Sequence, residues 1–364
     1  MDGLDSLNTI EEKLCYKAAI NNIPLIGAFE LLPLCNMDCS MCYIRLTPEE
    51  MKKNGCIRTC KEWLSIAEQM KKEGTLYVLL TGGEPLLYNE FEDIYSGLRN
   101  MGMIVSINTN ATLIDDNMAD FLEKNKPRRV NVTLYGASNK TYEKLCHNSK
   151  GYDETIKGIK LLKERNIDVK INVSLVKDNI SDLSKMMNLA DLLEIPISVY
   201  TYMYPKTKCR GKTFKDDYRL SPQQVAQIDN YVERRTETEE EFMKKRWLTL
   251  SAYEYEKNNE PPEFIPLQCR AGKCLFWINW QGNMTPCVFL DNIYTDVFEN
   301  GFTKSWNYII EKRNKILLPS DCASCEKRGV CQVCAASAYC ETGSMDEKPS
   351  YLCDLTQEML EILK

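Results

Sequence analysis

Short apolar runs alternate with helical stretches through the first 204 residues, and this alternation limits the fold more than any other feature of the sequence. Six runs have the length and composition of strands, at residues 25–32, 76–80, 104–108, 130–134, 169–176 and 197–202. Amphipathic segments separate them, at residues 60–73, 90–101, 115–124, 140–166 and 180–193. Strands joined by helical crossovers pair in parallel. Because a closed barrel of this kind needs eight units, we expect an α/β fold built as an open, partial (β/α)6 barrel.

The chain changes character after the sixth run. Ser221-Pro222 is typical of a helix start, with an N-cap followed by proline at the first helical position, and a helix rich in Glu, Lys and Arg should follow. From Cys269 onward, short segments, turns and cysteines predominate. These shifts predict four regions: an N-terminal segment (1–23), the barrel (24–204), a bridging helical region (205–266) and a small, irregular cysteine-rich domain (267–364).

Cysteine is unusually frequent, with 17 residues against a single histidine, His147. The acidic N-terminus has no apolar core of signal-peptide length, which argues against a secreted disulfide scaffold and for a cytoplasmic protein. The sequence contains no run of about 18 apolar residues, so it predicts no membrane span. The net charge is −6 without long basic runs, so we expect no nucleic-acid or membrane partner. With one histidine, the cysteines indicate all-thiolate sites, either four-cysteine zinc sites or iron–sulfur clusters.

Three cysteines, Cys35, Cys39 and Cys42, form a C-x3-C-x2-C motif directly after the first predicted strand. Each iron of a four-iron cubane needs its own external ligand, so three thiolates leave one iron open to a small molecule. A zinc site lacking one ligand, or three unrelated buried thiols, are the alternatives.

This triplet resembles the signature of the radical S-adenosylmethionine (SAM) superfamily, whose fold is a partial TIM-like barrel. The resemblance implies that Cys35, Cys39 and Cys42 hold the catalytic cluster, whose open iron chelates the amino and carboxylate groups of SAM. It also implies reductive cleavage of SAM to a 5′-deoxyadenosyl radical, which abstracts a hydrogen atom from the substrate.

A second motif, Thr81-Gly82-Gly83-Glu84-Pro85, follows the second predicted strand and resembles the GGEP motif of this family. Two glycines allow a close approach of the backbone, and a carboxylate suits an ammonium group. The resemblance assigns Gly82, Gly83 and Glu84 to the SAM amino group. It also implies SAM contacts from Met41, Asn108, Asn110, Thr133 and Asn172, although residues 171–179 lack the family's glycine-rich adenine motif.

Eight cysteines of the C-terminal region are similar in spacing to the SPASM extension of radical SAM enzymes, which holds two auxiliary 4Fe–4S clusters. A G-x4-C unit ends at Cys287, and a C-x2-C-x5-C-x2-C run begins at Cys322, one residue shorter than the family pattern in its last interval. The resemblance implies one auxiliary cluster on Cys269, Cys274, Cys287 and Cys334, and another on Cys322, Cys325, Cys331 and Cys353. With the SAM cluster this gives three 4Fe–4S clusters, with a zinc ribbon as the alternative for the tail.

Six cysteines remain, and most should be structural or free thiols: Cys15, Cys56, Cys60, Cys146, Cys209 and Cys340. Cys209 follows the last predicted strand and could face the substrate cavity, and Cys340 could compete as a ligand. We interpret His147 as non-catalytic.

The resemblance leaves the substrate open. We expect oxidative modification of a peptide or protein side chain, with an electron donor such as flavodoxin or ferredoxin. Dehydrogenation or rearrangement of a small metabolite, and a non-catalytic zinc- or iron-binding module, are the alternatives. The segment before the first strand is too short for the leader-binding domain of many peptide-modifying relatives. Sulfatase maturation is disfavoured, because Val288 follows Cys287 where relatives carry an aspartate, and Asp291 lies further on.

Overall fold

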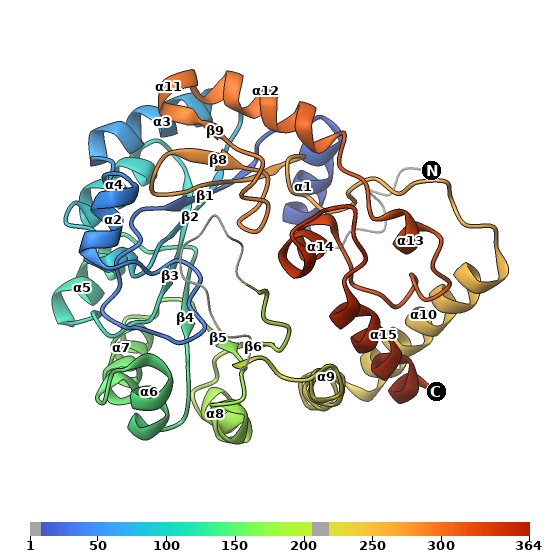
Figure 1. Cartoon of the computed structure of the whole chain (residues 1–364). Helices are drawn as coiled ribbons and strands as arrows, with labels where there is room; N and C mark the ends of the chain where they lie inside the picture. Colours follow the sequence, from blue (N-terminus) through green and yellow to red (C-terminus); the bar gives the residue numbers. More distant parts are fainter. Residues whose placement is uncertain (1–8, 206–217) are drawn as a thin grey trace.

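Six parallel strands form the centre of the fold in a computed structural model, which describes residues 9–205 and 218–364 (Figure 1). The strands are β1 (Ile26–Glu30), β2 (Tyr77–Thr81), β3 (Ile104–Thr109), β4 (Arg129–Thr133), β5 (Val169–Ser174) and β6 (Ile197–Tyr200). They lie side by side in chain order, each paired in parallel with the next. The predicted open, partial (β/α)6 barrel followed by a cysteine-rich region is therefore confirmed.

Helices cover the outer face of this sheet (Figure 1). They are α3 (Cys60–Lys72), α4 (Phe91–Asn100), α5 (Asp116–Lys124), α7 (Gly151–Glu164) and α8 (Leu183–Leu192). Strand side chains alternate between the two faces, so Ile107 and Val132 are buried while Asn108 and Thr133 are partly exposed. The inner face of the sheet is consequently polar near the C-terminal ends of the strands.

One predicted helix, residues 140–166, is two helices in the structure. Helix α6 (Asn139–Cys146) ends at His147, whose backbone has a φ of 52°. A left-handed residue at this position is a common helix end, and α7 begins afresh at Gly151. Because the apolar periodicity is helical on both sides of the break, the sequence predicted a single helix.

The C-terminal region extends the sheet. Strand β7 (Leu275–Ile278) pairs in parallel with β1, and β8 (Asn283–Thr285) and β9 (Thr295–Asp296) follow as antiparallel strands. The order across the sheet is β6-β5-β4-β3-β2-β1-β7-β8-β9. Strand β1 therefore has a neighbour on each side, and the C-terminal region continues the sheet of the barrel.

The bridging region holds two helices where the sequence suggested one. Helix α9 (Pro222–Thr236) starts at a capping box on Ser221, as predicted, and α10 (Glu239–Asn258) starts at a second capping box on Thr238. Helix α9 packs on α15. No helix within the described parts of the chain is both long and apolar enough to cross a bilayer.

The remaining helices are short or peripheral. The first, α1 (Ile10–Ile20) and α2 (Pro48–Asn54), flank β1 in the sequence, and the 3-10 turns are η1 (Pro85–Leu87) and η2 (Ile180–Asp182). The C-terminal region adds α11 (Val297–Asn300), α12 (Phe302–Arg313), α13 (Ser320–Ala323), α14 (Ala335–Thr342) and α15 (Ser350–Leu363). A buried pair, Arg219 with Glu341 at 2.6 Å, joins the segment before α9 to α14.

Candidate metal and cofactor site

The loop at residues 34–46, here called the cluster loop, carries the first cysteine triplet and rests on the C-terminal end of α6. The amides of Asp38 and Ser40 donate to the carbonyls of Cys146 and Leu145, both at 2.9 Å. The Nδ1 atom of His147 lies 2.6 Å from the carbonyl of Asp38. Three hydrogen bonds therefore fix the backbone on both sides of Cys39.

The three thiols of the cluster loop occupy a buried or half-buried environment suited to a cluster. Cys39 is buried, while Cys35 and Cys42 are partly covered. Backbone amides donate to two of the sulfurs, from Met37 to Cys35 at 3.4 Å and from Arg45 to Cys42 at 3.3 Å. Burial and then the nearby Glu84 charge raise the pKa of Cys35 to about 12. Thiols of this kind become thiolates when a metal binds them, and amide donors to sulfur stabilise that form.

Tyr135 approaches the same thiols from the barrel, two residues beyond the end of β4. The charges of Cys39 and Cys146 act on its hydroxyl more strongly than those of Cys42 and Cys35. The tyrosine backbone is fixed, because its amide donates to the Tyr142 hydroxyl at 3.2 Å and its carbonyl accepts from Asn179 at 2.9 Å. Burial and the neighbouring thiols raise the pKa of Tyr135 well above its ordinary value.

The two glycines of the second motif pack directly against the start of the cluster loop. A Cβ atom on Gly83 would lie 2.2 Å from the carbonyl oxygen of Leu34, and one on Gly82 would lie 2.6 Å from that of Leu32. The amides of Gly83 and Glu84 donate to the carbonyls of Leu32 and Leu34, at 2.8 and 2.9 Å. Only glycine permits this approach, which holds Glu84 beside the cysteine triplet.

Glu84 is fully buried and held by three donors. Its carboxylate accepts from the Thr109 hydroxyl at 2.7 Å, the Asn110 amide at 2.8 Å and the Leu86 amide at 3.1 Å. Burial raises the pKa of Glu84 to about 7, although the three donors oppose that rise. A buried carboxylate of this kind has a strong electrostatic preference for a cation, such as an ammonium group.

The other predicted SAM contacts lie along the C-terminal edge of the sheet. Asn110 donates to Asn36 at 2.9 Å and lies 3.8 Å from the Cys35 sulfur, so it joins β3 to the cluster loop. Asn108 accepts from Asn131 at 2.8 Å. Thr133 is paired in register with Asn172, whose buried Oδ1 atom has no hydrogen-bond partner, and Met41 is buried in the core.

Sequence reasoning missed several residues that contact this site: Asn36, Thr109, Asn131, Tyr135 and Cys146. Asn36 lies inside the cysteine motif and Thr109 ends a predicted strand, so both positions carried a usable signal. Cys146 and Tyr135 come from elsewhere in the chain and reach the site only through the packing of α6 and β4.

Four C-terminal cysteines line one cavity. Its volume is about 340 Å³, and its lining includes Cys322, Cys325, Cys331 and Cys353. Burial and then the other three thiols raise the pKa of Cys322 to about 11, while Lys348 opposes the rise. The chain therefore offers four thiols around one space with a lysine to balance their charge, which fits a 4Fe–4S cluster.

The other C-terminal cysteines are less evenly gathered. Burial, and to a lesser extent the charges of Cys334 and Cys269, raises the pKa of Cys287 to about 12, so these three thiols are near enough for their charges to interact. Cys340 also lies near Cys287 and Cys334. Cys274 packs instead in a small apolar cluster with Cys15, Ala18 and Leu25.

Within residues 9–205 and 218–364, no three or more His, Cys, Asp or Glu side chains converge on a point that could hold a single metal ion. A cubane takes one thiolate at each iron, so its ligands need not converge on one point. The remaining cysteines include Cys56, which is exposed, Cys60, which is buried, and Cys209, which lies outside the described residues.

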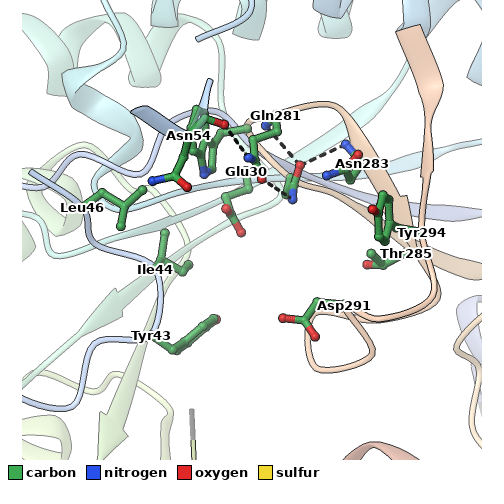
Figure 2. Close-up of a pocket in the computed structure, with 12 residues that line it drawn as sticks. Glu30, Tyr43, Ile44, Leu46, Asn54, Gln281, Asn283, Thr285, Asp291 and Tyr294 are labelled. Carbon is green, nitrogen blue, oxygen red and sulfur yellow. Dashed lines mark hydrogen bonds between the residues drawn. The ribbon is translucent and has the colours of Figure 1, made fainter. Parts of the chain in front are cut away.

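A further cavity of about 270 Å³ lies between the cluster loop and the β7–β8 hairpin (Figure 2). Its lining includes Glu30 at the end of β1, Tyr43 of the cluster loop, Asp291, and amide side chains that include Asn54 and Gln281. Figure 2 shows Tyr43 and Asp291 pointing toward the same space. The hairpin is tied to α2, because the Gln281 side chain donates to the Asn54 carbonyl at 2.7 Å.

Comparisons with known proteins identify the family. The sequence profile of the Radical SAM superfamily matches residues 29–190. An AdoMet-dependent heme synthase from Methanosarcina barkeri is 23% identical over 347 residues, which cover 92% of this chain and 97% of that protein. SuiB of Streptococcus suis bound to the precursor peptide SuiA has a TM-score of 0.67 and 19% identity, over 95% of this chain and 82% of that one. The structure of anSMEcpe with bound AdoMet has a TM-score of 0.67 and 18% identity, over 93% and 96% of the two chains.

Proposed function

We propose that this chain, which belongs to the radical SAM superfamily and is an enzyme that uses SAM and a 4Fe–4S cluster, oxidatively modifies a side chain of a peptide or protein. The observation that supports this most is the cavity between the cluster loop and the β7–β8 hairpin. It lies between Tyr43, next to the predicted ligand Cys42, and the hairpin that leads to Cys287. A substrate there would be adjacent to both the SAM site and an auxiliary cluster.

The residues have separate roles in this proposal. Cys35, Cys39 and Cys42 hold the SAM-cleaving cluster, and Glu84 accepts from the SAM amino group, with Gly82 and Gly83 keeping that carboxylate close to the loop. Met41, Asn108, Asn110, Thr133 and Asn172 surround the rest of SAM. When bound, SAM and the cluster supply a 5′-deoxyadenosyl radical that removes a hydrogen atom from the substrate.

The C-terminal cysteines complete the electron balance. We assign one auxiliary cluster to Cys269, Cys274, Cys287 and Cys334, and the other to Cys322, Cys325, Cys331 and Cys353. Loss of a hydrogen atom leaves a substrate radical, and a net two-electron oxidation requires that a second electron leave it. Clusters held by these cysteines would accept that electron as a proton leaves the substrate, and a carrier such as flavodoxin or ferredoxin would supply the electron that cleaves SAM.

A peptide substrate agrees with the chemistry of the cavity wall. The wall is polar, with amide side chains at Asn54, Asn279, Gln281 and Asn283, the groups that can pair with a peptide backbone. The Asn279 and Gln281 side chains already bond within the hairpin and to α2, so they shape the wall. SuiB, which has a similar fold, was solved with a precursor peptide. A small tetrapyrrole is the second candidate substrate, favoured by the similarity to the heme synthase over nearly all of that protein.

The test is anaerobic incubation of the reconstituted enzyme with SAM, a reductant and candidate substrates, followed by mass spectrometry. We expect a peptide that loses two hydrogen atoms together with formation of 5′-deoxyadenosine. The loaded protein should contain about 12 irons and about 12 sulfides if three cubanes form. A tetrapyrrole product, with no peptide altered, would establish the second candidate. Zinc without iron after anaerobic purification would refute the enzyme proposal.

A further inference from the structure

We propose that His147 is a positioning residue that holds the cluster loop against the end of helix α6 and thereby slows the loss of the SAM-cleaving cluster. It is the single histidine of the chain and lies outside both cysteine motifs. The inference rests on the proposed function through one step, the assignment of Cys39 as a ligand of that cluster.

The backbone of His147 has a conformation that most residues avoid. It ends α6 with a φ of 52° and a ψ of 38°, in the left-handed region. Glycine adopts this region without strain, whereas a residue with a Cβ atom does so at a conformational cost, and among these asparagine, aspartate and histidine occur there most often. A strained backbone that persists in a fold points to a contact made by its side chain.

The imidazole of His147 makes such a contact with the residue that precedes Cys39. Its Nδ1 atom lies 2.6 Å from the carbonyl oxygen of Asp38. A carbonyl oxygen only accepts, so Nδ1 carries the proton and donates. The Asp38 amide donates to the Cys146 carbonyl at 2.9 Å, and the Asp38 carboxylate pairs with Arg45 at 2.8 Å. Asp38 therefore joins the end of α6 to both sides of the cluster loop.

Helix α6 is itself fixed at its other end. The buried carboxylate of Asp182 accepts from the Ala137 amide at 2.9 Å and from the Thr141 hydroxyl at 2.5 Å. The inner side of the helix carries three fully buried residues, Tyr142, Leu145 and Cys146. The helix is therefore a fixed support that connects the segment between β5 and α8 to the cluster loop.

The consequence is a cluster loop that is ordered before its cysteines bind iron. A loop loses conformational freedom when it takes up a cluster, and a loop already held at Asp38 has less freedom to lose. Without the imidazole bond, we expect local opening of the loop and loss of the first cluster each to be about fivefold faster. This is the factor that corresponds to one hydrogen bond of about 1 kcal/mol.

The test is a series of variants at position 147, all of which tolerate the left-handed backbone. His147→Asn places an amide nitrogen on Cγ, where the imidazole carries Nδ1, so a donor to Asp38 remains. His147→Gly removes the donor, and His147→Asp places a carboxylate oxygen against the Asp38 carbonyl. We expect the asparagine variant to behave like the wild type, the glycine variant to open and lose iron about fivefold faster, and the aspartate variant to do so faster still.

Two measurements on the loaded holoenzyme follow these effects. Hydrogen exchange of residues 36–42, measured by mass spectrometry, reports local opening of the loop. The rate of iron loss to a chelator is followed for the first cluster through the EPR signal that changes when SAM binds. Iron whose signal does not respond to SAM should be lost at the same rate in every variant.

Asn166→Gly is the matched control. Asn166 follows α7 with a φ of 53°, just before β5 at the opposite edge of the sheet, and its replacement should leave both rates unchanged. Wild-type rates in His147→Gly, or equal rates in His147→Asn and His147→Gly, would overturn the inference. So would an equal acceleration of iron loss from the clusters that do not respond to SAM, since that indicates general destabilisation. Faster exchange in the expected order with unchanged iron loss would instead refute the assignment of Cys39 to the cluster.

Discussion

Glu84→Gln is the most direct test of the SAM site, because it removes one charge and keeps the shape of the side chain. The glutamine oxygen can still accept from Thr109 and Leu86, which share one carboxylate oxygen, while the new amide nitrogen faces the Asn110 amide that donates to the other. Two of the three bonds to residue 84 therefore remain, and the loop that carries it should stay in place. The lost interaction is a charge-assisted hydrogen bond from the SAM amino group to the carboxylate, worth about 1.5–3 kcal/mol. At about 1.4 kcal/mol for each factor of ten, SAM affinity should fall between roughly 10-fold and 150-fold.

The raised pKa of Glu84 adds a dependence on pH. Burial raises this pKa to about 7, and only the ionised carboxylate can make the charge-assisted hydrogen bond with the SAM amino group. The apparent affinity scales with the fraction of protein in the competent form, so wild-type affinity should fall about tenfold per pH unit below pH 7 and level off above it. Folding stability without SAM has the opposite sign. A raised carboxyl pKa contributes stability below its unfolded value that is lost as pH rises through about 7.

The assay is calorimetric titration of SAM into anaerobically reconstituted protein from pH 5.5 to 8.5. Glu84→Gln should bind weakly, without this pH dependence. Thr109→Val should move the midpoint to higher pH, because the Thr109 hydroxyl holds the pKa of Glu84 down. Glu299→Gln, at an exposed position of α11, serves as the matched control. Unchanged affinity in Glu84→Gln at pH 8 would exclude Glu84 from the SAM site.

Two further predictions address the cluster loop and the tail. Gly83→Ala should destabilise the protein by about 1–3 kcal/mol through overpacking and weaken iron retention at the first cluster. The control is Gly102→Ala, where an added Cβ meets nothing within 4 Å but the φ of 85° strains the backbone, so stability should fall while iron content stays unchanged. Urea unfolding and iron analysis measure both variants, and equal iron retention would contradict the packing argument. Cys322→Ala combined with Cys325→Ala should lower substrate product more than SAM cleavage, as measured by chromatography. Equal losses with an intact EPR signal from the first cluster would refute the electron path.

The parts of the fold predicted correctly are those encoded locally. All six barrel strands were located within a few residues, because their apolar runs are separated by amphipathic helices of ordinary length. The break at His147 was missed, since a left-handed residue leaves no mark on apolar periodicity. The pairing of β7 with β1 was also missed. That pairing depends on two short strands with almost the whole barrel between them in the sequence, and such a contact has no local signal.

In the candidate site, too, the residues predicted correctly are those that lie close together in the sequence. The cysteine triplet and Gly82-Gly83-Glu84 are compact motifs, and the packing of both glycines against the cluster loop gives a physical reason for their spacing. Tyr135 and Cys146 reach Cys39 only after β4 and α6 have packed. The ligand assignments themselves stay predictions, and the position of Cys274 among Cys15 and its apolar neighbours makes it the assignment most in need of a direct iron measurement.

The two-sided pairing of β1 has a consequence for biosynthesis. A ribosome releases β1 and β2 early, but β7 emerges only after the barrel and bridging helices have been made. Until then the strand that leads into the cluster loop has an open edge, which invites pairing with other chains. We therefore expect a nascent chain that matures late and needs protection from aggregation. A barrel expressed alone, without residues 267–364, should be poorly soluble whatever its metal content.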